Sequence, residues 1–181
     1  MSFRLSPEYA LLGILMAGPK HGYEMHIYFS SHMDQFWRLS MSQIYALLKR
    51  MEKNGVVISK EEWQDNRPAK KIFSITQTGK EGFLNWIYSP VNHVRNLRIE
   101  FMAKLFFIKE LKLKRATDII DKQIEILQEK LHFIQPPKEK IMDEFQKALH
   151  SFKIAQTTSA IAWLKECKTF FLKMEVEKRC L

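Results

Sequence analysis

A short polar series within residues 40–49 has the residue types that contact nucleic acid. Ser40, Ser42, Gln43 and Tyr45 each carry a hydrogen-bonding side chain, and Lys49 follows one helical turn after Tyr45. Gln can pair with adenine, whereas Ser and Tyr can bond base edges or phosphates. Lys supplies a charge for phosphate. If one helix carried all of these groups, its leading end could bind a base-paired surface.

The helix that would position this series has a clear start and a clear end. Ser40-Met41-Ser42-Gln43 is a capping box, in which the Ser40 hydroxyl accepts from the third helical N–H and Gln43 reaches back to the Ser40 N–H. We predict that the helix runs to about Asn54 and stops at Gly55. Its apolar residues share one face, which leaves most of the polar series off the core: Ile44, Leu47, Leu48 and Met51.

Structural roles compete with this interpretation. Tyr45 could be a core aromatic, but it directly follows Ile44 and the two side chains cannot both point inward. Gln43 could serve only as the partner of the cap. Lys49 could belong to an ordinary solvated helix face.

The elements around this helix complete a known arrangement. We predict helices from Ser6-Pro7 to Ala17 and from His21 to Met33, the latter with Tyr23, Ile27 and Phe29 facing inward. After the capped helix, Val56–Ile58 and Lys71–Ile75 indicate a β-hairpin with a polar tip, and a further helix ends near Ser89-Pro90.

This order describes a winged helix-turn-helix, whose second helix enters the DNA major groove. We therefore predict that Arg67, Lys70 and Lys71 at the hairpin reach a neighbouring phosphate backbone or the minor groove.

The positive charge of the first half of the chain is concentrated in the segment that this hypothesis places against DNA. The net charge is +9, and residues 38–80 hold nine Lys and Arg against four Asp and Glu, or +5. Residues 1–90 as a whole hold 11 against 8, or only +3. A basic balance permits an anionic partner without proving one.

Residues 91–181 contain no Gly and have a helical pattern after the boundary that we place at Pro90. We predict helices over 95–113, 116–134 and from Lys138 to about Lys178. The middle helix carries a heptad seam, which favours dimerisation over packing within one chain. The seam residues are spaced 4, 3, 4 and 3 apart: Ile120, Ile124, Leu127, Leu131 and Ile134.

Several classes of protein are disfavoured. The six His have no metal-ligand spacing, and no nucleophile motif or phosphate-binding Gly loop occurs. Cys167 and Cys180 form no CxxC motif, so we expect free thiols in a reducing cytoplasm. The longest apolar run, Tyr9–Ala17, is too short to span a bilayer. We therefore expect a cytoplasmic protein with no enzymatic activity, cofactor, metal or membrane partner.

The same residues resemble the PadR family of bacterial transcriptional regulators. The resemblance covers about residues 9–88, and a looser match begins at Arg98 and fades after about residue 110. Asn66 departs from the Gly that the family usually places before Arg-Pro, but Asn tolerates a left-handed turn. The matching motifs are Ala10-Leu11-Leu12-Gly13-Ile14-Leu15, Gly18-Pro19-Lys20-His21-Gly22-Tyr23-Glu24, Phe36-Trp37-Arg38-Leu39-Ser40, Gln43-Ile44-Tyr45, Leu48-Lys49-Arg50-Met51-Glu52, Gly55-Val56-Val57, Arg67-Pro68, Lys71-Ile72-Phe73 and Ile75-Thr76 followed by Gly79.

The resemblance implies a mostly α protein with an N-terminal winged helix-turn-helix domain (residues 1–90), a small β-hairpin wing and a C-terminal α-helical dimerisation domain (residues 91–181). It also implies a homodimeric repressor, less often an activator, on a pseudo-palindromic double-stranded DNA operator. Where such a regulator has a ligand, it is a small hydrophobic or phenolic molecule. The alternative is a helical protein-interaction module whose basic charge gives only non-specific DNA affinity.

Overall fold

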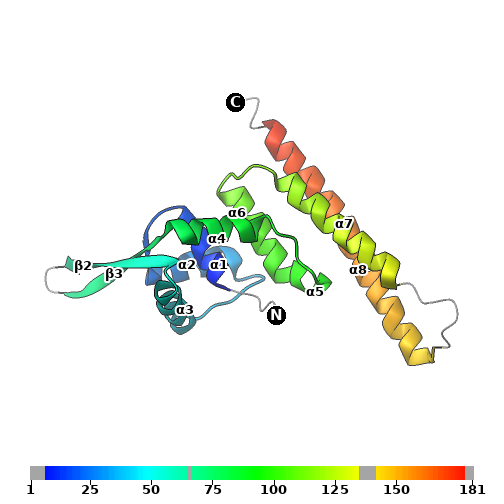
Figure 1. The fold of residues 1–181 in the computed structure, drawn as a ribbon, viewed down its shortest axis with the longest axis horizontal. Helices are drawn as coiled ribbons and strands as arrows, with labels where there is room; N and C mark the ends of the chain where they lie inside the picture. Colours follow the sequence, from blue (N-terminus) through cyan, green and yellow to red (C-terminus); the bar gives the residue numbers. More distant parts are fainter. Residues whose placement is uncertain (1–6, 65–66, 135–141, 178–181) are drawn as a thin grey trace. The chain divides into compact units, whose positions relative to one another are not determined.

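The computed structural model describes residues 7–64, 67–134 and 142–177, with side chains of 63–69 and 175–177 left aside. The fold is mostly helical with one small antiparallel sheet (Figure 1). None of the helices described is long and apolar enough to cross a membrane. In chain order the elements are α1 (Pro7–Met16), β1 (Lys20–His21), α2 (Gly22–Met33), α3 (Met41–Lys53), β2 (Val57–Gln64), β3 (Arg67–Ile75), α4 (Gln77–Ile87), α5 (Val94–Asn96), the π-helix η1 (Leu97–Phe101), α6 (Met102–Glu110), α7 (Ala116–Ile134) and α8 (Glu144–Glu177).

The chain folds as two compact units. The first contains residues up to Ser89 together with Met102–Lys112, and the second contains Pro90–Phe101 and the chain from Leu113. The first break therefore adjoins Pro90, but α6 returns to the first unit. Phe107 of α6 explains this return, because its ring lies where a side chain on Gly13 of α1 would be, 2.7 Å from the ideal Cβ position.

The core of the first unit lies among α1, α2 and α3. Most of α1 is buried, which agrees with its nearly continuous apolar sequence. In α2 the buried side chains are Met25, Phe29 and Met33, which are spaced four apart. The prediction that Tyr23 and Ile27 face inward is wrong, since they are 59% and 46% exposed. Because Met25, Phe29 and Met33 form the buried face of α2, Tyr23 and Ile27 point outward.

The sheet has the strand order β1-β3-β2 with antiparallel pairing throughout. The β2–β3 hairpin is the predicted wing, and Figure 1 shows it extending away from the helices of its unit. Val57 is buried opposite Ile75 at the base, and Ser59 lies opposite the buried Phe73. The predicted tip at Asn66 lies outside the described residues.

The second unit is built on α7 and α8, which run side by side in opposite directions (Figure 1). An ion pair joins them, with Lys168 Nζ 2.7 Å from Asp121 Oδ1. Gln123 of α7 is fully buried, and its amide accepts from the Val91 N–H at 2.7 Å and donates to the Val91 carbonyl at 3.0 Å. These two bonds attach the segment after Pro90 to α7.

Candidate nucleic-acid interface

The N-terminus of α3 is a closed network of hydrogen bonds. Ser40 Oγ accepts from the Gln43 N–H at 3.3 Å, and Gln43 Oε1 accepts from the Ser40 N–H at 2.9 Å. The Ser42 hydroxyl lies 3.0 Å from that of Ser40. The predicted capping box is therefore present in full. Because three side chains share these bonds, the leading end of α3 is held in one conformation.

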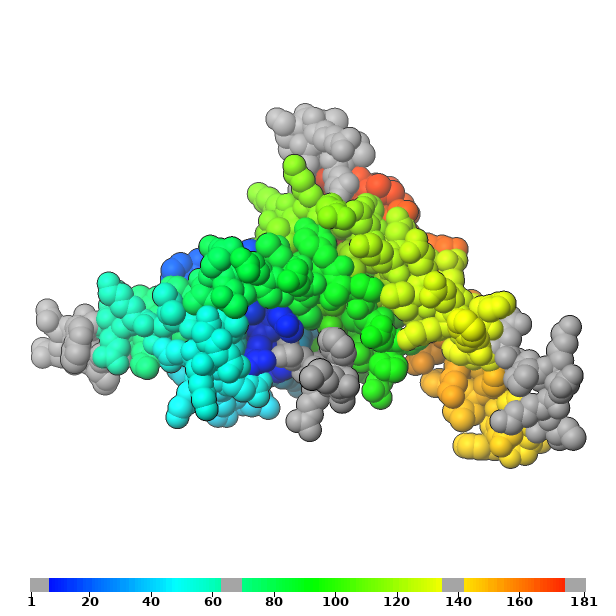
Figure 2. All heavy atoms as spheres, in the orientation of Figure 1, coloured from blue at the N-terminus to red at the C-terminus, as the bar shows by residue number. Residues whose placement is uncertain are grey.

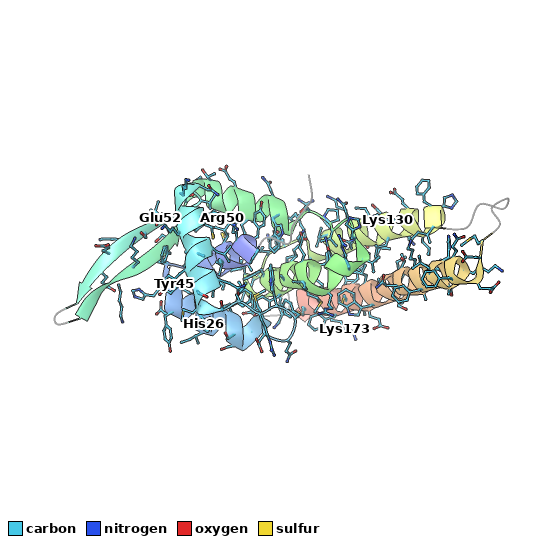
Figure 3. All side chains as sticks on the ribbon, turned by 90° about the horizontal axis from the view of Figure 1, so that it is seen from below. His26, Tyr45, Arg50, Glu52, Lys130 and Lys173 are labelled. Atoms are coloured by element: carbon cyan, nitrogen blue, oxygen red, sulfur yellow. The ribbon has the colours of Figure 1, made fainter. Side chains whose placement is uncertain are left out.

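The polar series projects from α3 on the side opposite the core. Ile44, Leu48 and Met51 have no exposed surface, whereas Ser42, Gln43, Tyr45 and Lys49 are exposed. On a helix with 100° per residue, Ser42, Ala46, Lys49 and Lys53 form the centre of the outward face. Gln43 and Arg50 flank it on one side, and Tyr45 and Glu52 on the other. Figure 3 shows Tyr45, Arg50 and Glu52 projecting from α3. The small Ala46 at the centre permits a close approach.

Tyr45 is held against the start of α2. A Cβ added to Gly22 would lie 2.8 Å from two ring atoms of Tyr45 and 3.0 Å from its hydroxyl oxygen. Tyr45 remains 46% exposed, so one side of the ring packs on backbone while the other faces outward. The sequence showed Gly22 only as part of a Gly-containing motif. Its role as a seat for Tyr45 depends on a contact between two helices.

Further contacts attach α3 to its neighbours. Arg50 Nε lies 2.6 Å from Glu8 Oε1 in α1, so this guanidinium has a protein partner. The Ser59 hydroxyl of β2 donates to Glu52. Thr76 donates to the Gly55 carbonyl at 2.8 Å, directly after the end of α3, where Gly55 has φ +70°. Helix, wing base and α1 therefore form one framework at the surface of the first unit (Figure 2).

The wing presents its charges in opposed pairs. Glu61 lies opposite Lys71, and Glu62 lies opposite Lys70. Since successive residues of a strand point to opposite faces, Lys70 and Lys71 are on different faces of the hairpin. Lys71 shares the face of Ser59, which is bonded to α3, while Lys70 lies on the other face. The Arg67 side chain lies outside the described residues.

Neither a metal-ligand cluster nor a thiol of lowered pKa is found in the part of the chain that the structure describes. There, no three His, Cys, Asp or Glu gather to hold a metal. Burial, reinforced by the charge of Glu166, raises the pKa of the Cys167 thiol, which keeps it protonated and a poor nucleophile. Cys180 lies outside the described residues.

The five residues of the predicted dimer seam differ in how far the structure buries them. Ile120, Ile124 and Leu127 are buried within the single chain, while Leu131 and Ile134 are half-buried. A different set of large apolar side chains is exposed on α8, at spacings of 4 and 3: Phe145, Leu149 and Phe152. With 34 residues, α8 is about 51 Å long, against about 28 Å for the 19 residues of α7. The helix α7 therefore cannot cover all of α8.

A cavity of about 300 Å³ lies within the second unit. Four of its lining residues can carry positive charge (His93, Arg95, Lys130 and Lys153), and Val94 and Ile134 add apolar surface. None of its lining residues is Asp or Glu. A volume at the lower end of the range for ligand pockets suits a small anionic molecule with an apolar part.

Comparisons with known proteins agree with these features. Residues 11–84 match the family described as transcriptional regulator PadR-like, and residues 97–171 match the family described as virulence activator alpha C-term. The negative transcriptional regulator PadR of Bacillus subtilis (strain 168) is 33% identical over 135 residues, which cover 75% of this chain and 74% of that protein.

Two solved structures of Bacillus subtilis PadR are also similar to the chain. The complex with operator DNA has 26% identity and a TM-score of 0.47, covering 90% of this chain and 97% of the other. The complex with p-coumaric acid has 25% identity and a TM-score of 0.43, covering 91% and 97%.

Proposed function

Since the chain belongs to the PadR-like family of transcriptional regulators, we propose that it is a homodimeric, cytoplasmic repressor that binds a pseudo-palindromic DNA operator. The family is not enzymatic, which agrees with the sequence-based expectation that the chain is not an enzyme. The repressor assignment follows the relative whose name calls it a negative regulator. The observation that carries the proposal is the capped, rigid and outward-facing N-terminal half of α3.

In this proposal α3 lies in the major groove, which is wide enough to admit a helix. Ser42 and Gln43 contact base edges, and Tyr45 contacts a base edge or a phosphate beside the start of α2. Lys49 contacts phosphate. Ser40 acts through the cap that holds Gln43. Lys53 follows Lys49 by one turn on the same face and adds a second cation.

The wing contributes phosphate contacts from one of its two faces. Lys71 is on the face that joins α3, so a duplex against α3 meets Lys71 rather than Lys70. Arg67 is proposed to contact DNA from the end of the hairpin. Because Glu61 lies opposite Lys71, the net charge of this strand pair is small, and the expected contribution of Lys71 to affinity is correspondingly modest.

The dimer is proposed to form through the part of α8 that α7 leaves uncovered. Phe145 and Phe152 are 77% and 61% exposed on one stripe with Leu149. Burial of such side chains is worth about 1.5–3 kcal/mol each, and a two-fold axis doubles every contact. Leu131 and Ile134 of the predicted seam are half-buried and remain available to a partner. Ile120, Ile124 and Leu127 would then support the interface from within each chain.

Release from DNA by a small phenolic acid is proposed for the cavity of the second unit. Its cations suit a carboxylate, and its apolar residues suit a ring. A ligand that prefers a dimer geometry unsuited to the operator weakens DNA binding by its differential affinity for the two states. Calorimetry with p-coumarate tests this role: Lys130→Ala should weaken binding about tenfold, whereas Lys122→Ala, outside the cavity, should not.

A gel-shift titration against the gene's own upstream region tests the main proposal. We expect much tighter binding than to random DNA, and weaker operator binding by Lys49→Ala and Tyr45→Ala. The alternative function, a protein-interaction module, predicts weak binding that depends on salt and not on sequence. Equal affinity for both DNAs, with neither variant changing it, would support that alternative.

A further inference from the structure

The oxygen and the nitrogen of the Gln43 side-chain amide differ in their hydrogen bonding. Its oxygen accepts from the Ser40 N–H at 2.9 Å, and a backbone N–H can pair only with an acceptor. Chemistry therefore fixes which end of the amide faces the helix. The Gln43 N–H donates in turn to Ser40 Oγ, so the side chain is held by a reciprocal pair of bonds.

The nitrogen end of the same amide is directed to no protein acceptor among the described residues. Gln43 is exposed at the flank of the outward face of α3, close to the small Ala46. Its Nε2 group carries two hydrogens and no lone pair for accepting. In the capped conformation, the group that this side chain offers to a ligand is therefore a hydrogen-bond donor.

Base edges in the major groove differ in what they can accept. Guanine presents two acceptors, N7 and O6, while adenine presents one at N7 and thymine one at O4; cytosine presents only the N4 donor. Bidentate pairing of Gln with adenine uses the amide oxygen as well as the nitrogen, because adenine N6 is a donor, so the capped side chain can make only the single bond to adenine N7. Turning Oε1 toward adenine would break the cap and leave the Ser40 N–H without its partner.

From these constraints we infer that Gln43 is a specificity-determining residue that selects guanine above adenine or thymine at one position of each half-site and rejects cytosine. Ser40 is the positioning residue that enforces the choice through the cap. This inference rests on the proposed function, since it assigns the base that α3 reads. A typical base contact gives roughly 5- to 150-fold discrimination, so the position should be visible in a selected sequence motif.

Selection of bound sequences from random DNA tests the inference, with the full-length wild type and Gln43→Glu compared. Glutamate at this position keeps the capping box but replaces the donor by an acceptor. The preference at one position of each half-site should therefore move from guanine to cytosine or adenine, whose exocyclic amino groups are donors. Gln43→Ala should lose the preference there. Thermal unfolding of Gln43→Glu checks that the capped helix is intact.

Gln35→Glu is the matched control, because Gln35 is exposed in the turn before Ser40 and undergoes the same change from amide to carboxylate. It should weaken binding to all sequences without moving any base preference. A wild-type motif that prefers cytosine or adenine over guanine at the Gln43 position would overturn the inference and leave the proposed function standing, as would a motif that neither Gln43 variant alters. No enriched motif for the wild type would overturn the proposed function itself.

Discussion

Substitution of Gly22 by alanine tests how α2 positions the DNA-contacting face. The new methyl group would lie 2.8 Å from the Tyr45 ring, which is closer than carbon atoms approach one another. The obstacle is the end of an exposed side chain, so the ring can move into solvent while the backbone stays in place. Gly22 has no positive φ that would exclude alanine. The expected consequence is a displaced Tyr45 in a folded protein.

The expected energies can be given separately for protein folding and for DNA binding. Alanine gains up to about 1 kcal/mol over glycine in a helix, less at the first residue of α2. Moving the Tyr45 ring away from its preferred conformation costs about 0.5–1.5 kcal/mol. The free energy of unfolding should therefore change by about 1.5 kcal/mol at most. Loss of one DNA contact costs about 1–3 kcal/mol of binding free energy, or roughly 5- to 150-fold in affinity.

Fluorescence anisotropy with the upstream DNA at one fixed salt concentration measures this loss. Gly82→Ala is the matched control, because a Cβ at Gly82 in α4 meets no atom within 4 Å. It should bind DNA as the wild type does. In a Tyr45→Ala background, Gly22→Ala should cause no further loss, since the contact is already absent. Wild-type DNA affinity of the Gly22→Ala variant would contradict this role of Gly22. The same loss of DNA affinity in the wild-type and Tyr45→Ala backgrounds would contradict it as well.

Three further predictions concern other parts of the chain. Lys49→Ala should weaken binding to all DNA sequences and reduce the slope of log K against log salt by about 1. Arg50→Ala should change this slope less, because the Arg50 side chain is already paired with Glu8 within the protein. Titrations of DNA binding at several salt concentrations would measure both slopes. Phe152→Glu should give monomers in sedimentation equilibrium, whereas Ser151→Glu should leave the dimer intact. Dimers of both variants would show that the interface does not include Phe152. Gln123→Leu should lower the free energy of unfolding by about 1–3 kcal/mol in chemical denaturation, because two buried backbone groups lose their partner, and wild-type stability would contradict that role.

Local signals predicted the parts of the fold that depend on short stretches of chain. The capping box at Ser40, the apolar face of α3 and the stop at Gly55 are decided within one helix, and the structure has all three. In α2 the pattern was ambiguous, because stripes through Tyr23 and Ile27 or through Phe29 are both helical. Only packing against the rest of the unit decides between them.

Features that depend on distant residues could not be predicted in the same way. The strand β1 has two residues, which is too short for any periodic pattern. The return of α6 to the first unit depends on Phe107 meeting Gly13, far apart in the sequence. The opposite faces of Lys70 and Lys71 follow from strand alternation, but their pairing with two glutamates needs the register of the hairpin.

In the proposed complex, two copies of α3 occupy the major groove of one symmetric site. Methylation interference on the bound upstream DNA tests it most directly, because methylation of guanine N7 blocks the major groove and that of adenine N3 blocks the minor groove. We expect that guanine methylation abolishes binding at two symmetric clusters, one helical turn of about 10 base pairs apart or a multiple of it. Interference only from adenine methylation, or from a single unsymmetric cluster, would contradict it.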